Sequence, residues 1–202
     1  MAHGRAGDGA TGAPPLGGRA ATGVLGEGQS VRAFVVREPG GGAVAMADME
    51  LQGWFAATRD GPYGIVDMRQ AVQERTGGAL RASQVFIQSN HSHSGADTMG
   101  VWGGVPLEYR QRIFERTVVT IVDAYEGRRT AARLVYGTAD GRDLLNNQFD
   151  YDPANQSVDS DVRVLQARNA RGKAIATLVN SPRTRPCSGP RTRRRRATGC
   201  SA

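Results

Sequence analysis

Two histidines stand two residues apart behind an apolar segment, and they are the side chains of this chain best suited to metal chemistry. Residues 85–89 read Val-Phe-Ile-Gln-Ser, and the chain then runs through His91 and His93 to Gly95. On an extended backbone, residues two apart point to the same side, so both imidazoles can face one space. Imidazole is the commonest metal ligand, and a catalytic zinc ion takes three protein ligands plus water. The pair therefore predicts part of a metal site that needs further ligands.

The elements that must position this pair alternate between strands and helices. Strands are predicted over residues 31–36 and 43–49, and the Gly-rich link between them favours a hairpin. A helix over residues 65–75 is predicted from apolar residues at helical spacing, and Gly77 is in the position that ends such a helix. The strand that leads to His91 comes next.

The second half of the sequence continues this alternation. The clearest helix spans about residues 107–125, and a strand is predicted at 133–137. Residues 162–167 and 174–179 predict a second hairpin. Interleaved helices and strands indicate an α/β fold with a mixed β-sheet and packed helices. The helix should bury one broad apolar face, formed by Tyr109, Ile113, Phe114, Val118, Ile121, Val122 and Tyr125.

Composition places the chain among globular proteins. It has 202 residues, of which 39% are hydrophobic and 22% charged, enough for one domain with a core or for part of a larger one. No apolar run approaches the roughly 20 residues of a membrane helix, so no transmembrane segment is predicted. The first eight residues lack the apolar stretch of a signal peptide. Residues 1–29, rich in Gly and Ala, are predicted to be a disordered or loose leader.

The positive charge is concentrated at the end of the chain. Residues 181–202 carry seven arginines and no acidic residue, which equals the whole formal charge of +7, so the remainder is formally neutral. Both cysteines, Cys187 and Cys200, also lie there, so no disulfide framework is predicted for the body. We expect a basic, disordered tail.

This tail supports an alternative function, a small basic module that binds nucleic acid or anionic lipid. Arginine contacts to phosphates give steeply salt-dependent binding, and deleting residues 181–202 would abolish it. The tail has no aromatic side chain that could stack on bases, so nucleic acid is the less favoured partner.

The order of the motifs is informative beyond the histidine pair. A strand ends in Ala-Asp-Met at 47–49, and a helix separates it from Asn-His-Ser-His-Ser-Gly at 90–95. A Trp-Gly loop, the long helix and an Ala-Arg-Leu-Val-Tyr-Gly strand follow, and an Asp-rich segment at 158–161 precedes the closing hairpin. Over about residues 30–180 this order resembles the amino-terminal domain of the neutral/alkaline, non-lysosomal ceramidase family.

The resemblance implies a fragment of a zinc-dependent amidohydrolase, the incomplete amino-terminal part of a larger catalytic domain. Family members cleave the N-acyl bond of ceramide to give sphingosine and a fatty acid, and they are commonly secreted or membrane-facing. His91 would then be a zinc ligand, and His93 would contact the substrate or the reacting water. Zinc would polarise the amide carbonyl and lower the pKa of bound water. The implied partner is a small-molecule lipid amide.

The sequence departs from the family pattern after Asn180. There the family continues to a second histidine ligand, whereas this chain reads Ser-Pro-Arg-Thr-Arg-Pro and has no later histidine. The other ligands, a Glu and a Tyr, and the catalytic serine would lie further on, so we expect a truncated chain that is inactive alone. We hypothesise a frameshift after residue 180. One set of GC-rich codons for residues 181–190, regrouped from the third base, reads Pro-Ala-His-Ala-Thr-Val-Leu-Gly-Pro.

Other interpretations of these residues are simpler. The two histidines can be polar residues that close a strand and bond to backbone. A metallo-β-lactamase-type site needs Asp and His directly after the pair, but Ser94 to Asp97 read Ser-Gly-Ala-Asp. We interpret Asp48 as a cap at a strand end and Trp102 as a residue that packs its loop.

Overall fold

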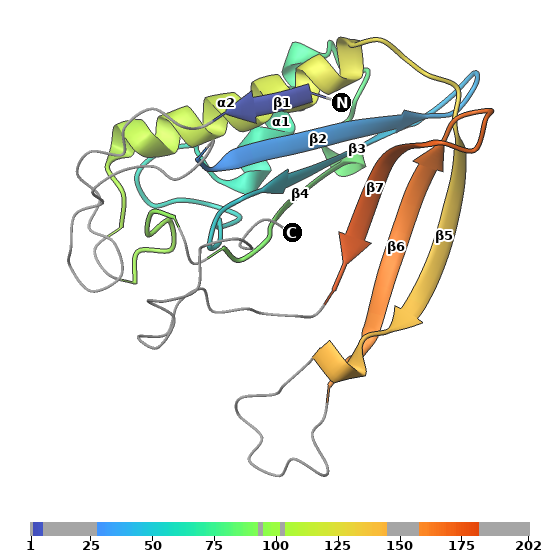
Figure 1. The fold of residues 1–202 in the computed structure, drawn as a ribbon. Helices are drawn as coiled ribbons and strands as arrows, with labels where there is room; N and C mark the ends of the chain where they lie inside the picture. Colours follow the sequence, from blue (N-terminus) through green and yellow to red (C-terminus); the bar gives the residue numbers. More distant parts are fainter. Residues whose placement is uncertain (1, 6–27, 93–94, 102–103, 145–157, 182–202) are drawn as a thin grey trace. The chain divides into compact units, whose positions relative to one another are not determined.

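The computed structural model describes residues 2–5, 28–92, 95–101, 104–144 and 158–181 (Figure 1). These residues fall into two compact units, of which the first ends at Gly127 and the second begins at Arg128. Most of the leader predicted over residues 1–29, and all but the first residue of the tail predicted over 181–202, lie outside the described residues.

The first unit is built on a four-stranded sheet, which is mixed as the sequence predicts. Its strands lie in the order β1 (Ala2–Arg5), β2 (Ser30–Arg37), β3 (Ala43–Met49) and β4 (Val85–Ser89). The pairs β1–β2 and β2–β3 are antiparallel, whereas β3–β4 is parallel. The short strand β1 falls within the residues predicted as a leader without regular structure.

The predicted β2–β3 hairpin is confirmed, and its turn depends on glycine. Gly40 adopts φ 79°, a left-handed conformation that glycine adopts without steric cost. The Glu38 N–H donates to the Gly42 carbonyl at 3.0 Å and closes the turn. Burial alternates along β3, with one face buried and the other intermediate, as expected for a sheet covered on one face.

Two helices form the layer that covers this buried face (Figure 1). Helix α1 (Ile65–Arg75) packs against β4 and α2, and α2 (Leu107–Glu126) packs against β1, β2 and β3. The bounds of both helices agree with the sequence prediction. None of the described helices is apolar enough over a sufficient length to cross a bilayer.

Glycine ends α1 as predicted. Gly77 and Gly78 adopt φ 59° and 80°, and their N–H groups donate to the carbonyls of Glu74 and Gln73 at 3.0 and 2.8 Å. This pair of bonds is a Schellman motif, which satisfies carbonyls that the helix end leaves open. The chain can then turn back toward β4.

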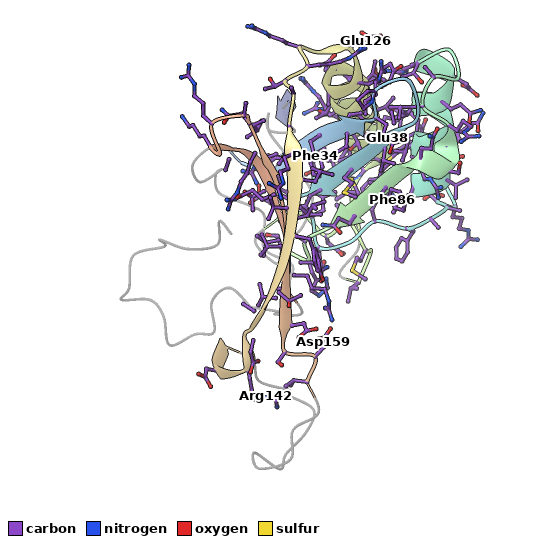
Figure 2. All side chains as sticks on the ribbon, turned by 90° about the vertical axis from the view of Figure 1, so that its right-hand side faces the viewer. Phe34, Glu38, Phe86, Glu126, Arg142 and Asp159 are labelled. Carbon is purple, nitrogen blue, oxygen red and sulfur yellow. The ribbon has the colours of Figure 1, made fainter. Side chains whose placement is uncertain are left out.

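The core lies between the sheet and the helix layer. Ala45 and Ala47 are buried on β3, and their small side chains allow helices to approach the sheet closely. From the predicted face of α2, Tyr109, Ile113, Val118 and Ile121 are buried. The largest side chains with less than 2% exposure are Met49, Leu51, Met68, Leu80, Ile113 and Ile121. On the opposite face of the sheet, Phe86 is 57% exposed (Figure 2).

The second unit is a separate, fully antiparallel sheet of three strands. Its order is β5 (Arg133–Asp140), β6 (Asp161–Arg168) and β7 (Ala174–Asn180). The predicted β6–β7 hairpin is confirmed, and β5 extends three residues beyond the predicted strand. In the hairpin turn, Asn169 Oδ1 accepts hydrogen bonds from the N–H groups of Arg171 and Lys173 at 2.9 and 3.0 Å.

Candidate functional site

The parallel pair β3–β4 brings two loops to the same edge of the sheet. Met49 lies opposite Ser89 in the register, so the chain leaves both strands at their carboxyl ends, called here the carboxyl edge. The loops then run side by side. The Asn90 N–H donates to the Met49 carbonyl, and the Ser92 N–H donates to the Leu51 carbonyl, both at 3.1 Å. In open α/β sheets, ligands commonly bind at such an edge.

His91 is held at the carboxyl edge by the neighbouring loop. Its Nδ1 lies 2.6 Å from the carbonyl oxygen of Gln52. A carbonyl can only accept a hydrogen bond, so Nδ1 carries the proton and Nε2 is the unprotonated nitrogen of the neutral ring. Histidines that bind metals almost always donate their other ring N–H in this way, which orients the ring. The hydrogen bond to Gln52 therefore orients the His91 ring in the way typical of metal-binding histidines.

The backbone of His91 differs from the extended conformation assumed for the sequence prediction. Strand β4 ends at Ser89, and His91 adopts φ 59°, the one positive φ of a non-glycine residue in the described parts of the chain. Such a conformation costs of order 1–3 kcal/mol and is frequent at functional sites. His93 lies outside the described residues, as does Ser94, so the shared orientation of the two imidazoles stays a prediction.

Asp97 organises the loop that follows, a role that the sequence analysis did not assign. Asp97 is 3% exposed, and its carboxylate accepts hydrogen bonds from the backbone N–H groups of Gly100, Val101 and Gly104, at 2.9, 3.1 and 2.9 Å. Gly100 and Gly104 both adopt φ 78°. An aspartate followed by glycines at these spacings is a signal of a side-chain-closed loop that the sequence does contain.

A second contact ties this loop to the one that holds His91. The Thr98 hydroxyl donates to the Gly53 carbonyl at 2.8 Å, and Thr98 is 6% exposed. Gln52 and Gly53 are adjacent in the sequence. Their carbonyl oxygens accept hydrogen bonds from the side chains of His91 and Thr98, which both follow β4. Trp102, predicted to pack this loop, lies outside the described residues.

Asp48 lies one residue before the end of β3 and does not cap the strand, which corrects the interpretation from the sequence. Its Oδ1 accepts a hydrogen bond from Gln88 Nε2, across the β3–β4 pair, at 3.2 Å. Burial raises the pKa of Asp48, while the Gln88 hydrogen bond and the charge of Arg32 act in the opposite direction. The three side chains form a polar row across β2, β3 and β4.

The described residues supply one candidate metal ligand rather than a complete set. Within the parts of the chain that the structure describes, no three His, Cys, Asp or Glu side chains gather closely enough to hold an ion. His91 fits the role because of its oriented ring. A zinc site needs further donors beside it.

Two solved structures with the same fold are ceramidases. A ceramidase complexed with C2 is 20% identical with a TM-score of 0.67, and the match covers 88% of this chain and 30% of that chain. Neutral ceramidase from Pseudomonas aeruginosa is 19% identical, with the same TM-score and coverage. The chain thus spans about 30% of the length of these structures. This likeness confirms the predicted α/β fold and the resemblance to part of a neutral ceramidase at the level of the fold.

Neither the family models nor the curated proteins contain a match to this sequence.

Proposed function

We propose that this chain carries part of a zinc-dependent amidohydrolase of the neutral ceramidase type. The enzyme would hydrolyse the N-acyl bond of ceramide, giving sphingosine and a fatty acid. The observation that carries the proposal is the hydrogen bond from His91 Nδ1 to the Gln52 carbonyl, on a fold shared with neutral ceramidases. It fixes the tautomer that a metal-binding imidazole needs.

The proposed roles divide between the two histidines. His91 would bind zinc through Nε2, and His93 would contact the substrate amide or the reacting water. When bound, zinc supplies a Lewis acid for the carbonyl and a water molecule of lowered pKa. Of the four zinc ligands that the family pattern implies, the described residues supply His91 alone. We therefore expect the 202-residue chain alone to hold zinc weakly and to show little or no amidase activity.

The test begins with the gene. The nucleotide sequence on both sides of codon 180 shows whether a one-base shift restores a histidine and a long downstream frame. The protein from the restored frame would then be analysed for zinc content and for hydrolysis of a fluorescent ceramide. We expect one zinc ion per site, with both properties lost in His91→Ala.

A matched control comes from the remaining histidine of the described residues. His3 lies in β1, so His3→Ala should keep zinc and activity. A restored protein without zinc would overturn the ceramidase proposal. Retention of zinc in His91→Ala would refute the ligand assignment alone, and the absence of any restoring shift would refute only the frameshift.

A further inference from the structure

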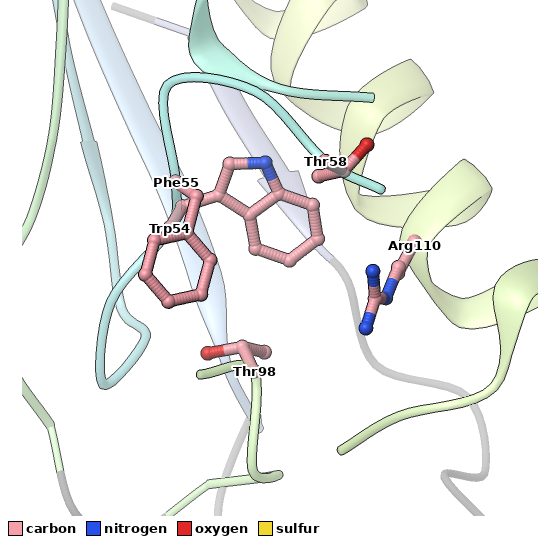
Figure 3. A pocket seen from close by; sticks show the side chains of 5 residues that line it. All are labelled: Trp54, Phe55, Thr58, Thr98 and Arg110. Carbon is pink, nitrogen blue, oxygen red and sulfur yellow. The ribbon is translucent and has the colours of Figure 1, made fainter. Parts of the chain in front are cut away.

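A small pocket opens beside the segment that holds His91. It is lined by Trp54, Phe55, Thr58, Thr98 and Arg110, and the space of about 190 Å³ between them is shallow and includes open solvent at its mouth (Figure 3). Trp54 and Phe55 follow Gln52 and Gly53 in the sequence, whereas Arg110 belongs to the first turns of α2. The pocket is therefore built from both loops of the carboxyl edge and the helix, all within the first unit.

Most polar atoms of the pocket residues are already used inside the protein. The indole N–H of Trp54 donates to the Tyr63 carbonyl at 2.8 Å. The hydroxyl of Thr98 donates to Gly53, and that of Thr58 donates to Gly61. These side chains and the Phe55 ring consequently offer mainly carbon atoms to a ligand.

Arg110 is the exception. Its guanidinium carries five N–H donors, and Figure 3 shows it pointing into the space lined by the other four side chains. The ion pair found for it among the described residues is with Asp60 Oδ2 at 3.5 Å, and the Asp60 side chain is 63% exposed. The Arg110 side chain is 22% exposed, but its partner is exposed and the separation is long, so this ion pair contributes little to stability. The guanidinium can therefore take a carboxylate or phosphate in a bidentate manner.

We propose that this pocket binds the anionic head of a single-chain amphiphile. Arg110 would pair with the carboxylate or phosphate, and the first methylene groups would lie against Trp54 and Phe55. Phe55 is 51% exposed, which gives the rest of the chain an apolar path out of the pocket. A free inorganic anion would leave the aromatic wall without a contact, and a neutral amphiphile would leave Arg110 without one. The proposal uses neither zinc nor His91, so it stands or falls separately from the amidohydrolase.

The pocket contains its own spectroscopic reporter. The chain has two tryptophans, so Trp102→Phe leaves Trp54 as the sole source of tryptophan fluorescence. This variant of the full chain would be titrated, below micelle-forming concentrations, with decanoate, decyl phosphate and uncharged decyl glucoside. We expect saturable changes, with the anionic compounds bound about tenfold more tightly than the glucoside. The comparison of decanoate with decyl phosphate decides which head is preferred.

Substitutions of single charged residues distinguish the effect of the Arg110 charge on binding from an effect on folding. Arg110→Gln should weaken binding of the anionic amphiphiles about tenfold and leave the glucoside unchanged. Arg112→Gln, on the same helix and exposed, is the matched control and should change neither. Asp60→Asn removes the competing carboxylate and should strengthen anion binding about threefold, a test that does not depend on the folding of the Arg110 variant.

Three results would overturn the proposal. They are equal affinity for anionic and neutral amphiphiles, equal effects of the two arginine substitutions, or no gain in anion binding from Asp60→Asn. Thermal unfolding followed by circular dichroism confirms that each variant is folded before its affinity is compared.

Discussion

The two units of this chain bury apolar side chains to different degrees. In the part of the chain that the structure describes, all buried apolar core residues lie between Val31 and Ile121. In the second unit, Tyr136 and Val179 are 64% and 54% exposed. The three-stranded sheet carries apolar residues on both faces. Tyr136 pairs with Leu165 on one face, and Val164 pairs with Val179 on the other face. Strands of this kind are typical of an inner layer that is covered on both sides. The mixed sheet has helices of its own, and the difference predicts unequal stability.

The largest effect should come from the core of the first unit. Ile121 is fully buried, so Ile121→Ala should lower the free energy of unfolding by about 3 kcal/mol, from lost burial and the cavity left behind. Leu134 is 45% exposed in β5, and Leu134→Ala should change the free energy of unfolding by less than about 1 kcal/mol. Amide hydrogen exchange, measured separately over residues 31–125 and 133–180, tests both. Equal effects would mean that the two units bury their side chains equally well.

A buried and an exposed aspartate give the next comparison. Asp97→Asn places an NH₂ group against backbone donors, so we expect a loss of about 2 kcal/mol in the first unit. Asp159 bonds to Arg163 in the second unit but is exposed, and Asp159→Asn should have a much smaller effect. Urea unfolding followed by Trp54 fluorescence in the Trp102→Phe background measures the effect of Asp97→Asn. Amide hydrogen exchange of β6 measures the effect of Asp159→Asn. A harmless Asp97→Asn would show that the loop does not depend on this carboxylate.

Left-handed backbone occurs at comparable places in both units, at His91 and at Gly172 in the β6–β7 turn. His91→Gly should be more stable than His91→Ala by about 1 kcal/mol, since both remove the ring and only alanine keeps the steric cost. Gly172→Ala should destabilise the hairpin by a similar amount, although a Cβ there would meet no atom within 4 Å. Equal stability of the two His91 variants in urea would mean that the loop relaxes at this position.

The smallest effect concerns the ion pair between the helices. Arg75 donates to both carboxylate oxygens of Glu115, at 2.7 and 2.6 Å, and this lowers the pKa of Glu115 from its ordinary value of 4.5. The stabilisation is therefore present above that value and is lost as the pH falls through the lowered pKa in the folded protein. Both side chains are partly exposed, so Glu115→Gln should cost only about 0.5 kcal/mol at pH 7 and nothing in acid. Urea unfolding at both pH values measures the difference. A loss that persisted in acid would contradict the ionic origin.

Local signals account for the parts of the fold that the sequence predicted well. Helix α1 and strand β3 have the predicted bounds because glycine and the spacing of apolar residues mark their ends within a few residues. Strand β1 was not predicted, because it exists through pairing with β2, far along the chain. The division into two sheets is equally non-local, because the residues within a single strand do not determine which other strands it pairs with.

The same distinction applies to the site. His91 could be found from its residue type and its place behind an apolar strand. Its partner could not, because the acceptor is the backbone carbonyl of Gln52, which any residue would provide. The left-handed φ of His91 was also beyond prediction, since a histidine gives no such signal where glycine would. Asp97 could have been found from the sequence, because Gly100 and Gly104 follow it at the spacing of a loop closed by a carboxylate.

The crossover between β3 and β4 has a consequence for the order of folding. Asp48 and Gln88 meet across 40 residues, whereas β6 and β7 are joined by the short turn 169–173. Hairpins close within microseconds, but distant strands pair only after a long loop has been brought together. The loops of the carboxyl edge are brought together by the pairing of β3 and β4, so we expect the His91 ring to be oriented late in folding. Chains still on the way to the native state would therefore have formed hairpins before the His91 ring is oriented.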